Sequence, residues 1–459
     1  MDKANLELQK VFDWIDSHRE ESVADLQALV RQPSVSAQKI GLGECAQLVV
    51  EVMNKDGLKA TAYPLAGGPP VVIGFVPSQS SAKTMAAYAH YDVQPPEPLD
   101  KWTHPPFGAE IAGGRLWGRG ATDNKSGVLA FIKAAKAWLE TTGDLPVGVR
   151  FLTEGEEEIG SPHLGPFVAA HPELFRADAM HCLDGWINHS ELVPEIDLGL
   201  KTVLYVELIA RGARTDIHSL NAPLVPQPAW DLVRALNTLV DEKRHILIDG
   251  WYEDLWQLGE EEMTQLEENA RRLDLAKLKA EWGIEHFALG RDGIEAIKAR
   301  AYEPTCNIAG LTSGYQGPGL KTIVPCEARA KIDFRLPPMI NPQKAITKLR
   351  KHLDEQGFAH IEIALDHMPE PPFKISVRED ISQAVIRAAQ RIYGKMPVVN
   401  GVSAEGTIVQ HVWMPTVMTG FAQPDCNLHA PDENIDLEHF VRGIKYAAAI
   451  MWEYGKGDL

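Results

Sequence analysis

The stretch "PVGVRFLTEGEEEIGS", residues 146–161, indicates the fold of its surroundings, because an apolar run ends in a concentration of charge. Residues 146–153 are typical of a buried strand. Four of the next five residues are glutamates: Glu154, Glu156, Glu157 and Glu158. The cluster has two interpretations. It is either a solvated charge run that opens a helix, where carboxylates favour the positive end of the helix dipole, or the binding place of a multivalent cation.

Further apolar runs alternate with helical patterns on both sides of this stretch. Residues 84–93 and 177–186 are strand-like, and residues 125–143 carry apolar side chains at helical spacing with a glycine at the end. Strands that alternate with helices indicate an α/β layer. We therefore expect an α/β domain with a mixed, mostly parallel sheet flanked by helices, formed by residues 1–198 and 379–459.

The middle of the chain follows a different pattern. "CEARAKIDFRL", residues 326–336, alternates strictly between apolar and charged side chains, and residues 360–367 also alternate. Such one-faced strands suit an antiparallel sheet covered on one side by helices. Residues 341–357 predict one covering helix, with asparagine as its N-cap and glycine as its stop. We expect an inserted α+β domain at roughly 199–378, and we interpret its charged stretch 250–283 as a solvated helical arm whose length suggests a lid or an oligomer contact.

The composition excludes several classes of partner. The chain has 459 residues, of which 45% are hydrophobic and 24% charged, and this is ordinary for globular domains. A net charge of -18 argues against nucleic acid and anionic membranes, and no apolar run approaches the ~20 residues of a membrane helix. The charged N-terminus lacks the apolar core of a secretory signal. Five dispersed cysteines without a CxxC pair indicate reduced thiols in a cytoplasmic protein and disfavour a cysteine-type zinc site.

Potential metal ligands follow short apolar runs at five places. These places hold His90 with Asp92, then Asp123, the glutamate cluster, Asp184 and His429. Taken singly, each is as well explained as a structural histidine or a turn aspartate, but sites in open α/β sheets form at the carboxyl ends of strands. Two histidines with several carboxylates suit zinc, manganese or cobalt. The set exceeds the about three protein ligands of one catalytic zinc, so it predicts two metal ions bridged by a carboxylate.

Four motifs carry a resemblance to a known family: "HYDVQP" (90–95), "LWGRGATDNKSG" (116–127), "EGEEEIGS" (154–161) and "GPGLKTIVP" (317–325). Their order and spacing resemble the metallopeptidase family that includes cytosolic non-specific dipeptidase, carnosinase, aminoacylase, glutamate carboxypeptidase and succinyl-diaminopimelate desuccinylase. The resemblance extends over nearly the whole chain and is closest to the dipeptidase branch. It implies a catalytic domain interrupted by a lid and dimerisation domain.

The resemblance assigns the ligands of two divalent metal ions, Zn²⁺ first and Mn²⁺ or Co²⁺ as alternatives. His90 would bind one ion and His429 the other. Asp123 would bridge the two ions, and Glu158 and Asp184 would complete one site each.

The resemblance also implies residues that support the metal site. Asp92 matches the family residue that orients the ligand histidine, and Glu157 corresponds to the general base that takes a proton from water and passes it to the leaving amine. The family has a cis peptide after the bridging aspartate, here the bond 123–124. Glu154 and Glu156 have no family role and keep the interpretation as solvated charges.

One histidine of the inserted domain bears on the oligomeric state. His218 matches the family histidine that reaches the partner subunit's active site and polarises the scissile carbonyl. This role implies a homodimer formed through the inserted domain. The family usually has glycine two residues later, where this chain has Leu220, so the local turn is an open question.

The remaining resemblances concern substrate contacts. Arg335 resembles the family arginine that grips the substrate carboxylate, which a guanidinium binds in bidentate fashion. Glu405, in a glycine-containing loop, would pair with a free substrate α-amino group, although a solvated loop glutamate is the alternative. The full set of expected substrate-binding residues is Arg335, His367, Glu405, Gly406 and Asn307.

The expected function is metal-dependent hydrolysis of peptide bonds in dipeptides or short peptides. The alternative enzyme is an N-acyl-amino-acid amidohydrolase of the aminoacylase or desuccinylase type, which has no ammonium group for Glu405 to recognise. A non-catalytic metal-binding protein is a third class, but it is disfavoured because all the ligands and the base are present.

Overall fold

The computed structural model describes residues 3–188, 191–365, 368–369, 371–403 and 414–456. The chain forms two compact units, each with its own hydrophobic core. Unit 1 comprises Met1–Leu198, Ile375–Asn400 and Thr407–Leu459, and unit 2 comprises Gly199–Lys374 and Gly401–Gly406.

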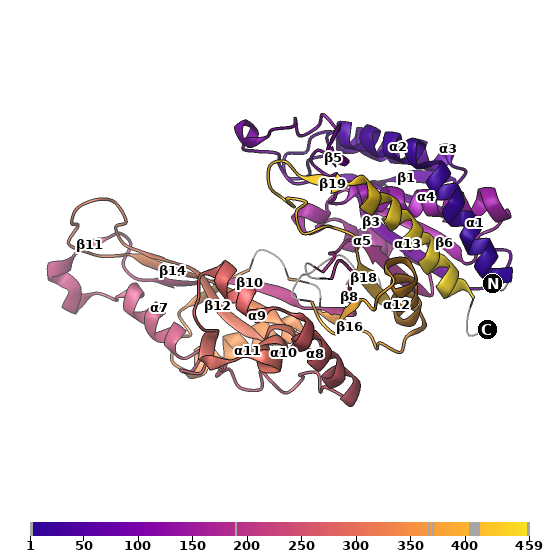
Figure 1. The fold of residues 1–459 in the computed structure, drawn as a ribbon. Helices are drawn as coiled ribbons and strands as arrows, with labels where there is room; N and C mark the ends of the chain where they lie inside the picture. The colour runs from indigo at the N-terminus through magenta and orange to yellow at the C-terminus, as the bar shows by residue number, and fades with distance from the viewer. Residues whose placement is uncertain (1–2, 189–190, 366–367, 370, 404–413, 457–459) are drawn as a thin grey trace. The chain divides into compact units, whose positions relative to one another are not determined.

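Unit 1 is built on an eight-stranded mixed sheet (Figure 1). In spatial order its strands are β1 (Ala60–Leu65), β2 (Gly68–Val76), β6 (Gly148–Glu154), β3 (Thr84–His90), β7 (Ala179–Leu183), β18 (Thr416–Thr419), β8 (Glu195–Asp197) and β17 (Val398–Asn400). The neighbours β6, β3, β7 and β18 run parallel, whereas β1, β2 and the β18–β8 pair are antiparallel. The predicted mixed, mostly parallel sheet is therefore confirmed, and its parallel strands end at one edge.

Helices flank this sheet. They are α1 (Lys3–Ser17), α2 (Arg19–Arg31), α3 (Leu42–Lys55), α4 (Lys125–Thr142), α5 (Leu164–Ala170), α6 (Pro172–Phe175), α12 (Asp380–Tyr393) and α13 (Leu437–Gly455). Figure 1 shows α13, in yellow, beside α1 and α12, so both ends of the chain contribute to one layer. The predicted helix at 125–143 is confirmed, and it stops at Gly143 because that residue takes the left-handed φ of 78° that glycine tolerates.

A small sheet brings two distant loops of unit 1 together. Its strands are β19 (Asn434–Asp436), β5 (Arg115–Trp117) and β4 (Glu110–Ala112), in that order. Because β19 pairs with β5, the loop before β19 lies beside the loop after β5. These loops contain His429 and Asp123.

Unit 2 contains a four-stranded antiparallel sheet with the order β12 (Thr305–Ser313), β14 (Glu327–Leu336), β10 (Thr202–Arg211) and β15 (Glu362–Ala364). Helices α7 (Pro228–Asn237) and α11 (Pro342–Glu355) share a core with one face of it. The alternate apolar residues of β14, from Ala328 to Leu336, are at most 1% exposed. The predicted one-faced sheet is thus confirmed, and Asn341 caps α11 by accepting a hydrogen bond from the backbone N–H of Lys344.

The rest of unit 2 consists of short ribbons and a helical arm. The ribbons pair β11 (Ile217–His218) with β13 (Ile323–Val324), and β9 (Gly199–Leu200) with β16 (Phe373–Lys374). The arm expected at 250–283 contains α8 (Glu260–Arg272) and α9 (Leu275–Trp282), and α10 (Gly293–Tyr302) follows it. The arm is not solvated throughout, because Trp251 is buried in the main core of unit 2 and Leu266 is buried in a small core with Tyr302 and Val402.

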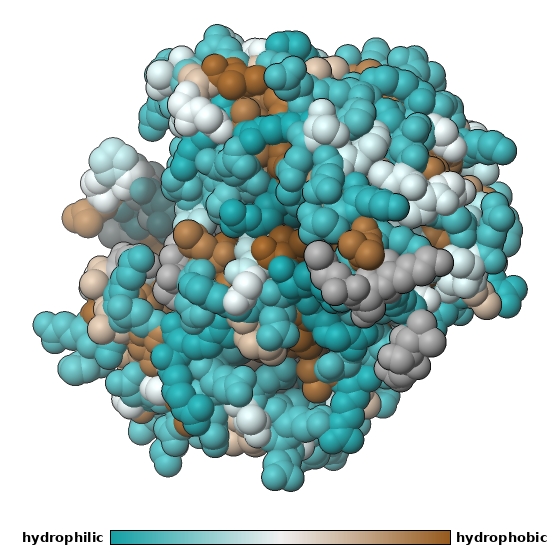
Figure 2. Space-filling model, turned by 45° about the vertical axis from the view of Figure 1, so that its right-hand side comes forward, coloured by the Kyte–Doolittle hydropathy of each residue, from teal (hydrophilic) through white to brown (hydrophobic). Residues whose placement is uncertain are grey.

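The surface is hydrophilic, as the ordinary globular composition predicts. The face drawn in Figure 2 is mostly hydrophilic and carries separate hydrophobic patches. All five cysteines are free thiols. Across the described ranges, no helix combines the length and apolar character that crossing a membrane requires.

Candidate metal centre

The carboxyl ends of three neighbouring parallel strands position the first group of polar side chains. His90 is the last residue of β3, and Asp184 follows the last residue of β7. Glu157 and Glu158 begin a short 3₁₀ helix, η2 (Glu157–Ile159), just after β6. Because β6, β3 and β7 run parallel, these residues lie at the same edge of the sheet.

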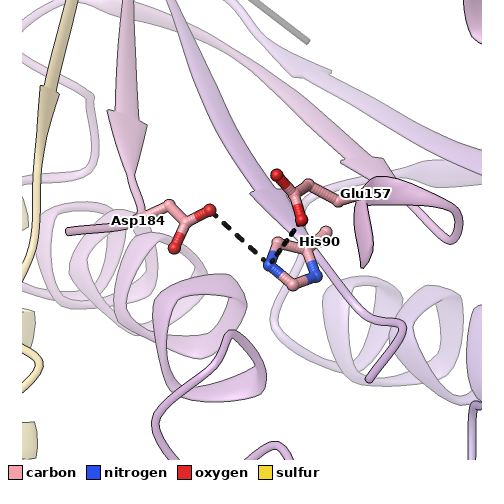
Figure 3. Close-up of side chains that lie close together, drawn as sticks. All are labelled: His90, Glu157 and Asp184. Carbon is pink, nitrogen blue, oxygen red and sulfur yellow. Dashed lines mark ion pairs between the residues drawn. The ribbon is translucent and has the colours of Figure 1, made fainter. Parts of the chain in front are cut away.

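His90 is the centre of the first group, which lies at this edge (Figure 3). Its Nε2 atom is 3.6 Å from Oδ2 of Asp184 and 4.0 Å from Oε2 of Glu157. The same Nε2 atom is 3.0 Å from Oδ1 of Asp123. The His90 side chain is fully buried, and three carboxylates converge on one of its imidazole nitrogens.

His429 is the centre of a second group formed with Asp123 and Glu158. Its Nε2 atom is 2.9 Å from Oδ2 of Asp123 and 3.3 Å from Oε2 of Glu158. The two oxygens of Asp123 therefore face different histidines, Oδ1 facing His90 and Oδ2 facing His429. The His429 side chain is 49% exposed, which leaves this second group open to a small molecule from solvent.

The loop that carries Asp123 has a constrained backbone. The peptide bond between Asp123 and Asn124 is cis, as predicted. The Asn124 side chain donates a hydrogen bond to the carbonyl oxygen of Leu183 at the end of β7. A Cβ atom at Gly127 would lie 2.2 Å from Oδ1 of Asn124, so only glycine fits there.

Asp92 contacts both the ring of His90 and the turn that carries Glu157 and Glu158. Its Oδ1 atom lies 3.3 Å from Nδ1 of His90. Its two oxygens also accept hydrogen bonds from the backbone N–H groups of Glu157 and Glu158, each at 3.1 Å. Asp92 is fully buried, and one side chain thus contacts the imidazole and holds the turn that carries both glutamates.

In the protein without metal, the carboxylates favour protons on both imidazoles. Hydrogen bonds to Asp123 and then Glu158 raise the pKa of His429 to about 10. Burial opposes a charge on His90, but contacts with Asp123 and then Asp184 raise its pKa well above the usual range. Only a neutral imidazole binds a cation, so metal binding must displace these protons.

The residues present fit divalent cations. Oε1 of Glu158 is buried and has no hydrogen-bond partner among the described residues, although buried polar atoms normally have one. Four carboxylates and two imidazoles also place an excess of negative charge in a largely buried space. Nitrogen and oxygen ligands of this kind suit zinc, manganese or cobalt.

The interpretation of the other two glutamates as solvated charges is wrong. Glu154 is 2% exposed and Glu156 is 4% exposed. Glu154 accepts hydrogen bonds from the hydroxyl groups of Tyr88 at 2.6 Å and Ser161 at 2.9 Å, and burial raises its pKa to about 7. Glu156 lies 2.9 Å from Nδ1 of His163. Their partners come from β3 and from the segment after η2, which local charge density does not indicate.

The expected substrate residues of unit 2 lie in two places. His218 is exposed at the end of β11, and its Nδ1 atom accepts a hydrogen bond from the backbone N–H of Leu220. Asn307 and Arg335 lie on the paired strands β12 and β14, where Asn307 is opposite Asp333 and donates a hydrogen bond to it at 2.8 Å. Outside the described residues are His367, Glu405 and Gly406.

Two buried charged residues near the metal ligands were not predicted. Arg119 and Glu433 form an ion pair of 2.7 Å between Nη1 and Oε2, with side chains 1% and 0% exposed. Both lie within motifs that contain a ligand, four residues before Asp123 and four residues after His429. In the sequence, only their short separation from the predicted ligands could have indicated a role at this site.

The comparisons with known proteins define the class. The model of peptidase family M20/M25/M40 matches residues 86–453, so the chain belongs to this family and is a metallopeptidase. The crystal structure of an M20 family metallo-carboxypeptidase from Sulfolobus solfataricus is 36% identical, with a TM-score of 0.86 over 95% of this chain and 99% of that one.

Dipeptidases are also among the similar proteins. The crystal structure of human carnosine dipeptidase 1 is 27% identical, with a TM-score of 0.76 over 98% of this chain and 99% of that one. The Cys-Gly metallodipeptidase dug1 of Schizosaccharomyces pombe is 28% identical over 96% of this chain and 97% of that protein. The chain is similar to these proteins over nearly their whole lengths.

Proposed function

We propose that this metallopeptidase hydrolyses dipeptides and other short peptides with a centre of two divalent metal ions, Zn²⁺ first. The observation that carries the proposal is the position of Asp123, whose two oxygens face the imidazoles of His90 and His429. A carboxylate placed between two imidazoles would help to hold two divalent cations, with one oxygen available to each. Asp184 would complete the ligands on the His90 side, and Glu158 those on the His429 side.

The protein's own groups then have distinct tasks. Bound cations would supply Lewis-acid polarisation of the scissile carbonyl and would ease the deprotonation of water. Glu157 would accept the water proton at its carboxylate and deliver it to the leaving amine nitrogen. Asp92 would hold His90 in the tautomer that presents Nε2 as a ligand, while keeping the backbone of Glu157 in place.

The substrate class is supported by the relatives and by two side chains. The relatives are named for Beta-Ala-His, Cys-Gly and carboxypeptidase activities, which share a short peptide with a free terminal carboxylate. Arg335 offers a guanidinium for that carboxylate, and its side chain is 41% exposed. Glu405 would bind the free α-amino group. We also propose a cytoplasmic location, in which five free thiols are expected.

A comparison of free and N-acetylated substrates tests this function. We expect chelator to abolish hydrolysis of a free dipeptide and Zn²⁺, Mn²⁺ or Co²⁺ to restore it, each measured by amino-acid release. The N-acetylated form of the same dipeptide should be cleaved at least about 10-fold more slowly, because a lost hydrogen bond to a charged group costs about 1.5–3 kcal/mol and about 1.4 kcal/mol is a factor of ten. Faster cleavage of the acetylated form would favour the amidohydrolase alternative instead.

We also propose that the protein is a homodimer formed through unit 2. The strand β12 is at the edge of its sheet, and an unpaired edge is a ready place for a second chain. Ile308 and Leu311 on this strand are 49% and 53% exposed, and Trp230 and Val233 of α7 are 58% and 45% exposed. Exposed apolar groups of this kind mark interaction surfaces.

If His218 acts in the partner's site, two inactive variants should complement each other. His218→Ala is expected to lower kcat by about 10²–10³-fold without loss of metal, the usual effect of removing one oxyanion donor. Mixing it with Glu157→Gln should recover about one quarter of wild-type activity, since half of the dimers are mixed and each has one intact site. The recovery is measured as the peptidase activity of the mixed sample at increasing times after mixing, while subunits exchange between dimers. His286→Ala, at another exposed histidine of unit 2, is the control, and no recovery on mixing would contradict action across subunits.

A further inference from the structure

Glu433 is a buried carboxylate whose oxygens are both fully used by hydrogen bonds. Oε1 accepts from the backbone N–H groups of Thr122 and Asp123, each at 3.1 Å. Oε2 accepts from the backbone N–H of Gly120 at 3.0 Å and from Nη1 of Arg119 at 2.7 Å. A carboxylate has about four acceptor positions, so Glu433 has none left for a metal ion and is not a ligand.

Arg119 adds a second contact to the loop of His429 and extends the network to the loop after β3. Its Nη2 atom lies 3.3 Å from the carbonyl oxygen of Ala430, next to His429, and 3.5 Å from that of Pro95. Its guanidinium lies over the ring of Trp102, 5.4 Å from the centroid. The ion pair therefore joins the loop after β3, the loop that carries Asp123 and the loop that carries His429.

The loop of His429 needs such support. His429 has φ 58°, and Asn427 and Asp432 have φ 55° and 59°. Residues other than glycine rarely adopt this left-handed backbone conformation. Where they do, the surrounding structure must hold the backbone in place. Glu433 follows this segment directly and is anchored by four hydrogen bonds, so it fixes the end of the strained loop.

The same arrangement occurs on the other side of the metal centre. Asp92 accepts hydrogen bonds from the consecutive N–H groups of Glu157 and Glu158, as Glu433 does from those of Thr122 and Asp123. The turns that present Glu158 and Asp123 are thus each held at the backbone by a buried carboxylate that is not itself a ligand.

We propose that Glu433, paired with Arg119, is a positioning residue that sets the affinity of the Asp123–Glu158–His429 group for its metal ion. It directs the Asp123 carboxylate through the backbone of residues 120–123 and the His429 ring through the loop that ends at Glu433. This inference rests on the metal centre of the proposed function, but not on the identity of the substrate.

The substitution Glu433→Gln tests the proposal. A glutamine has the same shape, but its amide NH₂ would face N–H donors on whichever side it is placed, so at least one pair of hydrogen bonds is lost. We expect the affinity for Zn²⁺ and Co²⁺ to fall about 10–100-fold, the usual effect of losing a partner behind a ligand. Competition with a chromophoric chelator measures the affinity, and the visible spectrum of bound Co²⁺ reports the ligand geometry.

Glu453→Gln is the matched control. Glu453 is a buried glutamate of α13 that pairs with Arg387 at 2.9 Å and Arg391 at 3.0 Å, and none of its contacts is a metal ligand. The substitution Glu453→Gln should lower the midpoint of thermal unfolding without changing the metal affinity or the Co²⁺ spectrum. Excess metal should restore much of the kcat of Glu433→Gln, which a purely structural loss would not allow.

Wild-type metal affinity and an unchanged Co²⁺ spectrum in Glu433→Gln would overturn the proposal. Should that variant not fold by circular dichroism, Glu433→Asp decides the question. Aspartate keeps the charge opposite Arg119 but is one methylene too short to reach both sets of donors, so weaker metal binding supports the proposal and unchanged binding rejects it. If wild-type protein binds metal but cleaves no peptide, the proposed activity is wrong and this inference stands.

Discussion

Glu157→Gln is expected to lower kcat by about 10²–10⁴-fold, the usual contribution of a general acid–base group, while both metal ions stay bound. Glutamine keeps the shape of the side chain but cannot accept the water proton. In the protein without metal, burial raises the pKa of the Glu157 carboxyl well above its usual range, an effect that His90 opposes and Asp184 reinforces. Steady-state kinetics with metal analysis of the same sample measures both quantities.

The metal content decides between two roles for Glu157. Its carboxylate lies close enough to His90 and Asp184 to be a third ligand of that group. A ligand role predicts loss of one ion in Glu157→Gln, whereas a base role predicts loss of turnover alone. Glu156→Gln is the neighbouring control, because Glu156 contacts His163 rather than the metal ligands and its substitution should keep kcat. Full activity of Glu157→Gln with both ions bound would reject the assignment.

Asp123→Asn is expected to remove both metal ions and with them the activity. Each Asp123 oxygen faces a different histidine, and a neutral amide cannot offset the repulsion between two bridged cations. The metal affinity should fall by more than about 100-fold, the upper range for residues that only support a ligand. Calorimetric titration of the metal-free protein with Zn²⁺ measures the number of sites and their affinity.

A buried aspartate elsewhere provides the control for this substitution. Asp56 of unit 1 pairs with Lys133 at 2.6 Å through a fully buried side chain. Asp56→Asn should destabilise the fold but leave two metal sites. If Asp123→Asn retains one tight site, then Asp123 belongs to one ion only and the bridging role is wrong.

Hydrophobic periodicity predicted the sheets of both units because the pattern of apolar residues along each strand matches the faces of that strand that are buried. Residues 84–90, 148–154 and 179–183 are mostly apolar, and all of them except Thr84 and Arg150 are buried, as is typical of parallel strands covered on both faces. In β14 every second side chain is apolar, as one buried face requires. The cis bond at Asp123 came instead from the family resemblance, since nothing in the local residue types specifies it.

Burial of charge is where sequence reasoning failed. Glu154 and Glu156 have the composition of a solvated run, and only their tertiary partners Tyr88, Ser161 and His163 show that they are internal. The ion pair of Arg119 with Glu433 was overlooked for the same reason, since the two residues are more than 300 positions apart in the chain. A charged side chain is stable inside a protein only when paired, and pairing over such distances leaves no local pattern.

The sequence by itself determined the strand and helix pattern, because this follows from hydrophobic period. It predicted an α+β insertion in an α/β domain from the same patterns, and it predicted the ligands at strand ends from motif spacing together with the family resemblance. The resemblance predicted Asp123 between His90 and His429, but only the tertiary structure decided that Asp184 lies with His90 and Glu158 with His429. It also decided that buried Asp92 and Glu433 hold the backbone of the ligand-bearing turns. The physical reason is that hydrogen-bond direction depends on atoms from several distant segments, whereas periodicity depends on neighbouring residues alone.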